Sequence, residues 1–580
     1  MKNCLPVCLQ QKFNKASKMK RTVSILAAAL ALCACSSPTP RVDSNIELGA
    51  TVIPYPRHCE YSTGVLYLDN SLVSVSSRFG SRTFDYVNEF AERLSKCSSS
   101  EVEVSSFRFK PAKGSSIAIC YDGSLPDETY ELKVDENGAR ISSSSHNGVV
   151  YAIATIRQML PPAIFSCDAP SESPEDSGTD WMIPFCDISD APAYGYRGVH
   201  LDCARHFFPV EKVKKYLDIM AQYKFNRFHW HLTDDQGWRI ESRKYPKLTE
   251  IGSVRAGTMV GMDWDSDDGI PHGGYYTQDE LRDVVAYADR LGITIVPEID
   301  LPGHMVAALA SYPELGCTGG PYEVRKTWGI AEDVLCAGKE ETYRFLEDIL
   351  GEVADIFPGE IFHIGGDECP KTAWKNCPHC QAKIAELGLE DKDGVSAEQY
   401  LQNYVTHRVQ QMLAAKGKRV MGWDEITEGN LDKGVTVMFW RGWLPVEKTI
   451  RAYVANGYDV VMTPNSFCYL DYVQSEDRQS EPVGYGVLTL EKMYSFDMTK
   501  GLSPEELSHV KGIQGNLWTE FTQTWDDVEY MLLPRLFALS CLAWDADDRP
   551  DYETFLKDVQ SHQIPILNAW GINFRNFTIN

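Results

Sequence analysis

Short apolar runs alternate with amphipathic stretches from about residue 192 to near the C-terminus. One amphipathic stretch has Val213, Leu217 and Met220 at the i, i+4 and i+7 spacing of a single helix face. Another begins at Thr277 with Glu280 three residues later, which is the pattern of a capping box at a helix N-terminus. The apolar runs are predicted to be strands, and there are eight of them: 197–202, 227–232, 294–299, 361–364, 419–422, 436–440, 459–462 and 512–518.

Strands that alternate with helices along a chain indicate a parallel sheet. Eight such units in about 350 residues predict a (β/α)8 barrel, a TIM barrel, within residues 191–570. A doubly wound sheet is the alternative. The barrel is favoured because eight units are present and no glycine-rich phosphate loop opens any of the predicted helices.

Residues 50–165 have a different pattern, in which short β-like runs and turns precede one helical segment at 148–160. This predicts a small α+β domain ahead of the barrel. Residues 166–190 begin with a stretch rich in Pro, Ser and Asp, and they are predicted to be a linker. The β-like runs are 65–68, 116–119 and 130–134.

The N-terminal residues have the pattern of a targeting sequence rather than of a folded domain. Lys20 and Arg21 follow Met19, which is the expected start of the translated chain. The apolar segment 22–32 comes next and is too short for a stable transmembrane helix.

This segment ends in the sequence LCAC at Cys35, which resembles a bacterial lipobox. Residues 1–35 are therefore predicted to be a lipoprotein signal peptide, which is favoured over a plain signal peptide, with a lipid on Cys35. Residues 36–49 are predicted to be a flexible tether. The expected location is the Gram-negative cell envelope, with a lipid anchor in the membrane.

Composition and charge exclude several classes of protein. Apolar residues make up 43% of the chain and charged residues 24%, which is typical of a globular protein and not of a disordered, collagenous or multi-span membrane protein. The chain has 56 Lys and Arg against 81 Asp and Glu, a net charge of −25, so nucleic acid is not an expected partner. The 13 Trp and 28 Tyr fit a large core, and they also fit sites that stack on sugars.

Seventeen cysteines are present, and 13 of them follow Cys35, so at least one of these is unpaired within the chain. Cys369, Cys377 and Cys380 form a cluster that contains a CxxC segment, CPHC. A CxxC segment can be a redox pair, half of a zinc site or a structural element that holds a loop together. No thioredoxin-like pattern surrounds it, and the other half of a zinc site is not evident. A structural loop, with a disulfide as one form of it, is therefore favoured over a metal site.

Polar and aromatic residues follow the ends of the predicted strands, which form the active-site face of a TIM barrel. Indoles pack on the apolar face of a pyranose, while carboxylates hold hydroxyls or donate protons. A carbohydrate site is therefore favoured over the alternative that the tryptophans only close the top of the barrel. The residues at the strand ends are Arg205, His206, Asp234, Asp235, His304, His363, Asp367, Glu368, Trp423, Asp424, Glu425, Trp440, Tyr469, Asp471, Trp518 and Glu520.

Asp367 and Glu368 are adjacent, and neighbouring side chains on a strand point to opposite faces. They are therefore not expected to flank a glycosidic bond as an acid and a nucleophile roughly 5 Å apart. One of them can donate a proton while the other holds a substrate group. Such an arrangement suits a substrate that supplies its own nucleophile, for example a 2-acetamido carbonyl that attacks C1.

Together these motifs resemble those of family 20 glycoside hydrolases, the β-N-acetylhexosaminidases, over residues 192–545 and also in the preceding α+β domain. The resemblance implies exo-acting, retaining hydrolysis of terminal β-linked N-acetylhexosamine from glycans by substrate-assisted catalysis through an oxazolinium intermediate, without a cofactor. The motifs that carry it are HWHLTDDQGWR (229–239), DLPGH (300–304), HIGGDE (363–368), GWDE (422–425), YLDY (469–472) and NLWTE (516–520), with RHFF at 205–208.

The resemblance also implies a role for each matching residue. Glu368 is implied as the general acid and then the general base, Asp367 as the acceptor of the acetamido N–H, and Tyr469 as the donor to the acetamido oxygen. Asp234 and His304 are implied to hold and tune Glu368. The other residues are implied to bind the sugar: Arg205 at the 3- and 4-hydroxyls, Asp471 and Glu520 at the remaining hydroxyls, and Trp423, Trp440 and Trp518 around the acetamido methyl group.

Some assignments stay open. For Glu298 and Asp235, a buried charge that braces the barrel is favoured over a role in the site, and Asp424 and Glu425 are ambiguous in the same way. Two other functions are weighed against a glycosidase: a glycan-binding lipoprotein without catalysis, and a metal-dependent hydrolase. The second would use His304, His363, Asp367 and Glu368, but no HxH or HExxH spacing places two histidines at a strand end.

Overall fold

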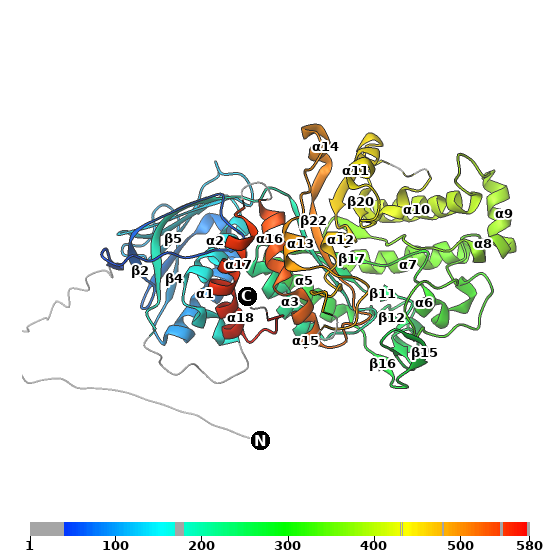
Figure 1. Ribbon diagram of the computed structural model, residues 1–580, viewed down its shortest axis with the longest axis horizontal. Helices are drawn as coiled ribbons and strands as arrows, with labels where there is room; N and C mark the ends of the chain where they lie inside the picture. The colour runs from blue at the N-terminus through cyan, green and yellow to red at the C-terminus, as the bar shows by residue number, and fades with distance from the viewer. Residues whose placement is uncertain are drawn as a thin grey trace, which may run out of the picture.

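The computed structural model describes residues 40–168, 179–429, 431, 433–477, 481–545 and 549–576. The predicted signal peptide 1–35, with Met19 and Cys35, lies outside the described residues, as does the start of the predicted tether 36–49. Figure 1 shows a sheet domain beside a larger barrel, with the C-terminal helices between the two and against the sheet domain.

The first domain is built on one eight-stranded sheet with the strand order β1-β2-β8-β6-β7-β5-β3-β4. Helices α1 (Ser81–Ser98) and α2 (His146–Met159) pack on the sheet and against each other. Helix α2 begins where the Ser145 hydroxyl accepts a hydrogen bond from the Gly148 N–H, which satisfies one of the free donors of its first turn. The strands are β1 (Arg41–Asp43), β2 (His58–Tyr67), β3 (Leu72–Ser76), β4 (Glu103–Phe107), β5 (Ile117–Tyr121), β6 (Tyr130–Asp135), β7 (Gly138–Ser143) and β8 (Met182–Asp190).

The predicted linker 166–190 is wrong at its C-terminal end, because β8 lies in the sheet between β2 and β6 and pairs antiparallel with both. Residues 183–186 are all buried, and because neighbouring strand residues point to opposite faces, both faces of the sheet are covered there. The predicted tether is also too long, because β1 pairs with β2. The α+β domain predicted for residues 50–165 thus extends in both directions.

The second domain is a closed barrel of eight parallel strands in chain order, which confirms the predicted (β/α)8 architecture. Each of the eight predicted strands is found, with ends that shift by at most two residues. The strands are β9 (Tyr196–Asp202), β10 (Arg227–His231), β17 (Thr294–Glu298), β18 (Ile361–His363), β19 (Arg419–Trp423), β20 (Thr436–Phe439), β21 (Asp459–Met462) and β22 (Val510–Leu517).

Helices and short insertions surround the barrel. The capping box predicted at Thr277 and Glu280 is present at the start of α5. The helices outside the strands include α3 (Val210–Gln222), α5 (Gln278–Arg290), α6 (Val306–Ser311), α7 (Glu340–Ile356), α8 (Thr372–Asn376), α9 (Pro378–Leu387), α10 (Ala397–Ala415), α11 (Val446–Ala455), α15 (Trp525–Leu532) and α16 (Arg535–Trp544).

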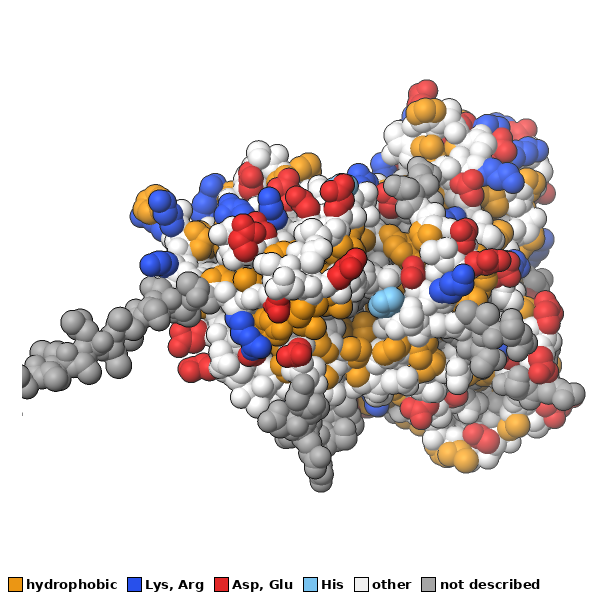
Figure 2. Space-filling model, turned by 60° about the vertical axis from the view of Figure 1, so that its left-hand side comes forward, with side chains coloured by type: hydrophobic (Ala, Val, Ile, Leu, Met, Phe, Trp, Pro, Cys, Tyr) orange, Lys and Arg blue, Asp and Glu red, His pale blue; other side chains and the backbone are white. Residues whose placement is uncertain are grey.

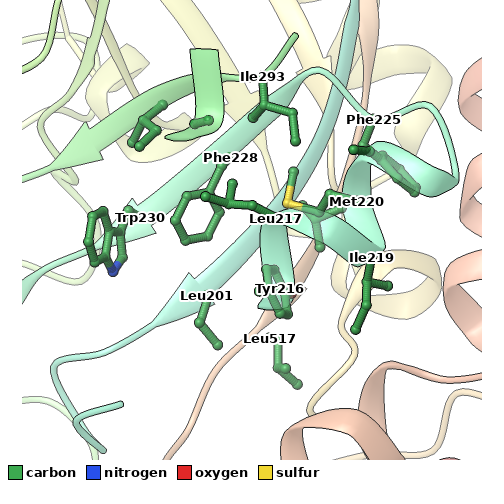
Figure 3. Packing of buried hydrophobic residues seen from close by; sticks show 14 of the residues in the cluster. Leu201, Tyr216, Leu217, Ile219, Met220, Phe225, Phe228, Trp230, Ile293 and Leu517 are labelled. Atoms are coloured by element: carbon green, nitrogen blue, oxygen red, sulfur yellow. The ribbon is translucent and has the colours of Figure 1, made fainter. Parts of the chain in front are cut away.

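Helix α3 shows how the barrel core forms. Its predicted apolar face is buried, and Figure 3 shows Leu217 and Met220 beside Phe228 of β10 and Ile293. Each buried side chain of this size contributes about 1.5–3 kcal/mol relative to an exposed one. The helical spacing of these residues is therefore what fixes α3 against the strands.

Two ion pairs, each with a buried cation, join the domains. Lys224, which follows α3, lies 2.8 Å from Asp190 at the end of β8, and both side chains are fully buried. Arg197 of β9 lies 2.9 Å from Glu128 of the first domain. Because the removal of one partner would leave a buried charge uncompensated, these contacts fix the first domain against the base of the barrel.

The last two helices, α17 (Tyr552–Asp558) and α18 (Ile564–Trp570), pack against the first domain. The Tyr55 hydroxyl donates to Asp558 at 2.8 Å, and the rings of Phe165 and Trp570 lie 5.0 Å apart. In Figure 1 both helices lie beside α1 and α2. The C-terminal end of the chain therefore completes the core of the N-terminal domain.

The surface is mixed in character. Figure 2 shows acidic, basic and apolar side chains interspersed over one face, so the acidic surplus of the chain is dispersed there. Within the described ranges, no helix combines the length and the apolar character needed to cross a membrane.

Candidate active site

A cavity of about 450 Å³ lies at the carboxyl ends of the barrel strands. Ten of the eleven residues predicted for the site line this cavity, and the eleventh, Asp234, lies directly behind it. The ten are Arg205, His304, Asp367, Glu368, Trp423, Trp440, Tyr469, Asp471, Trp518 and Glu520.

Asp367 and Glu368 lie in a turn and not on a strand, because β18 ends at His363. The expectation that they point to opposite faces of a strand is therefore wrong, and both side chains line the cavity. Gly365 and Gly366 make the turn possible, since both have positive φ. A side chain at Gly365 would collide with Asp300, whose carboxylate accepts a hydrogen bond from the Gly366 N–H at 3.2 Å.

His304 connects this pair to Asp234. Its Nδ1 lies 3.2 Å from Asp234 Oδ1, and its Nε2 lies 3.8 Å from an oxygen of each of Asp367 and Glu368. Burial alone would lower the pKa of His304, but the neighbouring Asp234 and Asp235 carboxylates raise it well above its usual range. The imidazolium form is therefore favoured, and it places a positive charge beside the two carboxyl groups.

The two carboxyl groups differ in exposure. The Glu368 side chain is 35% exposed and that of Asp367 is 14% exposed, so Glu368 is the more accessible of the two. Burial and the nearby Asp367 raise the pKa of Glu368. Burial also raises the pKa of Asp367. A raised pKa keeps Glu368 protonated closer to neutral pH, as a general acid requires.

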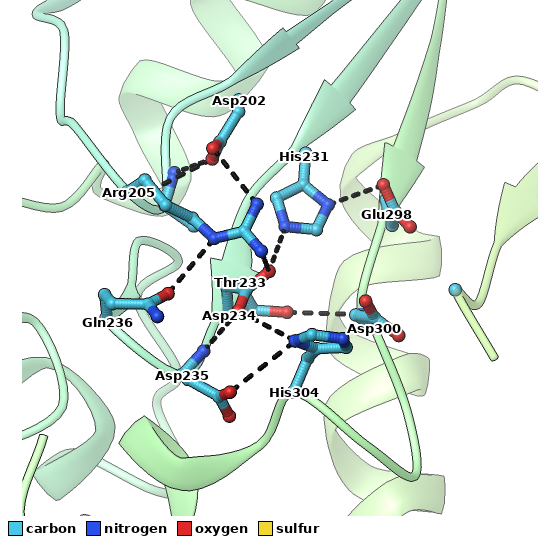
Figure 4. A network of polar contacts seen from close by, with 12 residues as sticks. Asp202, Arg205, His231, Thr233, Asp234, Asp235, Gln236, Glu298, Asp300 and His304 are labelled. Carbon is cyan, nitrogen blue, oxygen red and sulfur yellow. Dashed lines mark hydrogen bonds and ion pairs between the residues drawn. The ribbon is translucent and has the colours of Figure 1, made fainter. Parts of the chain in front are cut away.

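Arg205 is held in a fixed orientation by acidic and amide groups (Figure 4). Its guanidinium lies 2.8 Å from Asp234 and 3.2 Å from Asp202, and it donates to Gln236 at 3.1 Å. Burial lowers the pKa of Arg205, but Asp234 and Asp202 raise it well above its usual range. Sequence reasoning missed Asp202 and Gln236, although Asp202 ends the first predicted strand and therefore lies at the active-site face.

Asp471 and Glu520 both line the cavity and lie close enough to affect each other's charge. Burial, with Glu520 nearby, raises the pKa of Asp471 well above its usual range. Burial also raises the pKa of Glu520, and the positive charge of Arg205 opposes this. Oδ1 of Asp471 is buried and has no hydrogen-bond partner among the described residues. Two half-buried carboxyl side chains beside an arginine can hold hydroxyl groups that enter the cavity.

Four aromatic side chains form one wall of the cavity. Trp440 stacks on Tyr469 at 6.1 Å, and the rings of Trp423 and Trp518 lie 5.7 Å apart. The indole N–H of Trp440 donates to Glu425 at 2.8 Å, which fixes the orientation of the ring. The wall is thus apolar and rigid, with the Tyr469 hydroxyl as its polar group.

Glu298 is a buried brace, as sequence reasoning favoured, and it does not line the cavity. It accepts a hydrogen bond from the Trp423 indole at 2.9 Å and lies 2.9 Å from His363 and 2.6 Å from His231. Burial raises the pKa of Glu298, but the adjacent histidines lower it well below its usual range. His363 therefore contacts Glu298 and does not line the cavity. The four residues weighed for a metal-dependent hydrolase, His304, His363, Asp367 and Glu368, are thus not brought together in one site.

The acidic residues whose roles the sequence left open, Asp424, Glu425 and Asp235, also hold neighbouring side chains in place. Asp424 lies 3.0 Å from Arg441 and accepts from Tyr453, while Glu425 holds Trp440. Asp235 lies 3.5 Å from His304, beside Asp234. None of these three acidic side chains lines the cavity.

Six residues that the sequence analysis did not select also line the cavity. Trp264 is 52% exposed and Ile330 is 50% exposed, so they form the rim rather than the floor. They come from insertions after the second and third barrel strands, and a sequence offers no strand-end signal for such positions. The six are Trp264, Gly329, Ile330, Asn465, Tyr472 and Tyr485.

Family models match most of the chain. Residues 194–547 match the model described as "Glycosyl hydrolase family 20, catalytic domain", and residues 50–191 match "Glycosyl hydrolase family 20, domain 2". The boundary between the two matches follows β8, in agreement with the structure and not with the predicted linker.

Curated relatives agree with this assignment. A protein of Porphyromonas gingivalis named "Beta-hexosaminidase" is 38% identical over 564 residues, which is 96% of this chain and 68% of the relative. A protein of Akkermansia muciniphila with the same name is 34% identical over 77% of this chain and 85% of its own length.

Solved structures have the same fold. The N-acetyl-β-hexosaminidase of Streptomyces plicatus, in complex with Thio-NAglucal, has a TM-score of 0.77 at 30% identity and covers 92% of this chain and 99% of its own. The β-N-acetylhexosaminidase of Bacteroides fragilis has a TM-score of 0.75 at 28% identity, over 91% of this chain and 97% of its own.

Proposed function

This chain belongs to glycosyl hydrolase family 20 and is a β-N-acetylhexosaminidase that hydrolyses terminal N-acetylhexosamine, and on this basis we propose that the substrate's own 2-acetamido group is the nucleophile. The observation that carries the proposal is the single turn that holds Asp367 and Glu368 beside the aromatic wall. The two carboxyl groups face the same cavity from adjacent positions, so they do not flank a bond from opposite sides as an acid and a nucleophile do.

In the first step the acetamido carbonyl oxygen bonds to C1 as the bond from C1 to the leaving oxygen breaks. Glu368 gives its proton to that leaving oxygen, and its raised pKa supports this role. The ring that closes is an oxazolinium, and Asp367 accepts a hydrogen bond from its N–H and stabilises its positive charge.

In the second step a water molecule replaces the leaving group. Glu368, now a carboxylate, removes a proton from the water while the water oxygen bonds to C1. The bond between C1 and the acetamido oxygen breaks, and the acetamide is restored. Two inversions at C1 give net retention of the β configuration.

The aromatic wall supports the choice of an acetamide as the nucleophile. Trp423, Trp440 and Trp518 offer an apolar space that suits a methyl group, and the Tyr469 hydroxyl suits the carbonyl oxygen as a donor. Tyr469 lies 8% exposed and stacks on Trp440, so its position changes little on binding. The wall therefore presents the oxygen to C1 in one orientation.

Arg205, Asp471 and Glu520 support removal of a terminal sugar. They line the cavity with groups matched to hydroxyls, while the exposed Trp264 and Ile330 lie at its rim. The buried charge of Arg205 is already compensated by Asp202 and Asp234, so it can bind neutral hydroxyls without an added carboxylate. The rest of a glycan then extends past Trp264 and Ile330.

The test compares substrates that differ only at C2. Aryl β-glycosides of 2-acetamido sugars are expected to be hydrolysed with retention, and matched plain glucosides and galactosides to react negligibly. A thiazoline that mimics the oxazolinium is expected to inhibit far more tightly than substrate binds. Efficient hydrolysis of a plain glucoside, or a sugar trapped covalently on a side chain, would contradict the proposal. Tight glycan binding without turnover would instead identify a glycan-binding protein.

A further inference from the structure

Four cysteine side chains from three separate segments meet on the side of the barrel near α9. Cys317 follows a short helical turn, Cys336 precedes α7, and Cys377 and Cys380 lie at the start of α9. All four sulfur atoms lie within 4.8 Å of one another. Cys336, Cys377 and Cys380 are buried, while Cys317 is half-buried.

The distances between the sulfurs match those of a metal centre. Sγ of Cys336 lies 3.7 Å from that of Cys377 and 3.6 Å from that of Cys380, and Cys317 lies 3.9 Å from Cys380. A tetrahedral zinc ion with Zn–S bonds of about 2.3 Å separates its sulfurs by about 3.8 Å. All four cysteines are free, whereas Cys97 forms a disulfide.

The backbone around the cluster brings the first two sulfurs together. Gly316 and Leu335 form an antiparallel bridge, and the Cys336 N–H donates to the Leu315 carbonyl at 2.8 Å. The bridge therefore holds together the two segments that carry Cys317 and Cys336, although 18 residues separate these cysteines in the sequence. Their Sγ atoms lie within 4.8 Å of each other.

The second pair of sulfurs is presented by the first turn of α9. Cys377 caps this helix and Cys380 lies in its first turn, where the positive end of the helix dipole favours thiolates. Gly338 packs against this turn so closely that an added Cβ would lie 2.2 Å from the His379 carbonyl oxygen. A glycine is thus required where the two halves of the cluster meet.

We propose that these four cysteines bind one structural zinc ion. Four thiolates, three of them buried here, in a closed arrangement are typical of structural zinc, which is tetrahedral and leaves no position for substrate. Each thiol loses its proton as it binds the metal. The CPHC segment is thus half of a zinc site, and the half that the sequence analysis did not find is Cys317 with Cys336. None of the four lines the active-site cavity.

The metal would fix both ends of a loop that reaches the active site. Residues 317–336 carry Gly329 and Ile330 of the cavity rim. The same loop contains Arg325, whose backbone N–H donates to the Asp235 carbonyl at 3.2 Å. Loss of zinc is therefore expected to loosen the rim and weaken substrate binding, while the chemical step at Glu368 is kept.

The first experiment measures metal and thiols in the purified, full-length protein, and it does not depend on the proposed function. Elemental analysis is expected to find one zinc per chain. Titration of thiols in denaturant, without reductant but with a chelator, is expected to include all four cysteines among the free thiols. Absence of zinc, iron in its place, or four thiols missing as disulfides would each overturn the assignment.

The second experiment uses variants with matched controls. Cys377→Ser combined with Cys380→Ser is expected to abolish zinc binding, whereas Cys59→Ser combined with Cys120→Ser, in the first domain, is expected to keep it. Cys317→His is expected to retain zinc, because an imidazole nitrogen can replace a thiolate, and Cys317→Ser is expected to weaken binding. Equal zinc content in all four variants would contradict the proposed ligands.

Because the double variant can fail to fold, the wild-type enzyme supplies a third measurement. Zinc released from it by a mercurial thiol reagent is expected to raise KM several-fold while kcat changes little. This kinetic measurement rests on the proposed function, whereas the measurement of metal content does not. The proposed function and the proposed zinc site can therefore fail separately. A loss of kcat with unchanged KM would overturn the proposed role at the rim.

Discussion

His304 Nε2 lies 3.8 Å from Oε2 of Glu368, close enough for the charge on one to set the protonation of the other. The imidazolium stabilises the Glu368 carboxylate and so opposes the effects of burial and of Asp367, which both raise the pKa of Glu368. The protonation of the proposed general acid is therefore a balance between burial and neighbouring charges, and the charges of His304 and Asp367 can each be removed by a substitution.

Replacement of His304 tests one side of this balance. His304→Gln removes a positive charge, so the pKa of Glu368 is expected to rise further. Since Glu368 must be protonated to act, the alkaline limb of the pH profile of kcat/KM is expected to move to higher pH, with a lower plateau. His407→Gln, at an exposed position of α10, is the control and should leave the limb in place. A move to lower pH would contradict the assignment.

Replacement of Asp367 is expected to have the opposite effect on the same limb. Asp367→Asn removes a negative charge that raises the pKa of Glu368, so the alkaline limb should move to lower pH. The loss of charge stabilisation at the oxazolinium should also reduce kcat, by about 10²–10³-fold. Asp355→Asn, on the surface, is the matched control. If both His304→Gln and Asp367→Asn shift the limb in one direction, the electrostatic explanation fails.

Glu368→Gln tests proton donation to the leaving group. With a poor leaving group, kcat is expected to fall by about 10²–10⁴-fold, the usual contribution of a general acid. With a very acidic leaving group the loss should be much smaller, because little protonation is needed for departure. Glu386→Gln, on the outer face of α9, serves as the control. Equal losses on both kinds of substrate would assign Glu368 another role.

Arg205→Lys tests the binding of the terminal sugar. A lysine has one point of charge and cannot reach Asp202, Asp234 and Gln236 together, so the buried acceptors lose partners. The expected result is a fall in kcat/KM of roughly 10- to 100-fold, from one or two charge-assisted hydrogen bonds. A lower melting temperature should accompany it, whereas Arg344→Lys, an exposed change, should alter neither. An unchanged kcat/KM would remove Arg205 from the site.

Membrane anchoring is proposed from the sequence alone, through the lipid on Cys35. Cys35→Ser is expected to release the protein from the membrane fraction of cells, as measured by fractionation and immunoblotting. Cys33→Ser alters the other cysteine of the LCAC segment and should leave the partition unchanged. Persistence of Cys35→Ser in the membrane fraction would rule out this anchor.

The sequence predicted the barrel well because alternation of apolar runs and helical spacing is local information. The eight strands and the capping box at Thr277 follow from it directly. The prediction from local sequence failed for β8, whose residues come directly after a stretch of Pro, Ser and Asp. The partners of β8 in the sheet, β2 and β6, lie far away in the chain, and composition does not reveal them.

Most residues that line the candidate site could be predicted from their places at strand ends. Their supports could not, because the contacts of Asp202 and Gln236 with Arg205 depend on the packing of separate loops. The pairing of Cys317 with Cys336 depends in the same way on one bridge between backbones. The turn at Gly365 was missed because Asp367 and Glu368 were treated as neighbours on a strand, although the predicted strand ends at residue 364.

The docking of α17 and α18 against the first domain has a consequence for the order of synthesis. The N-terminal sheet leaves the ribosome long before these helices, yet the ring of Phe165 finds its partner, Trp570, only in the last part of the chain. The first domain to be made is therefore the last to be completed, and its apolar surface must stay protected until translation ends.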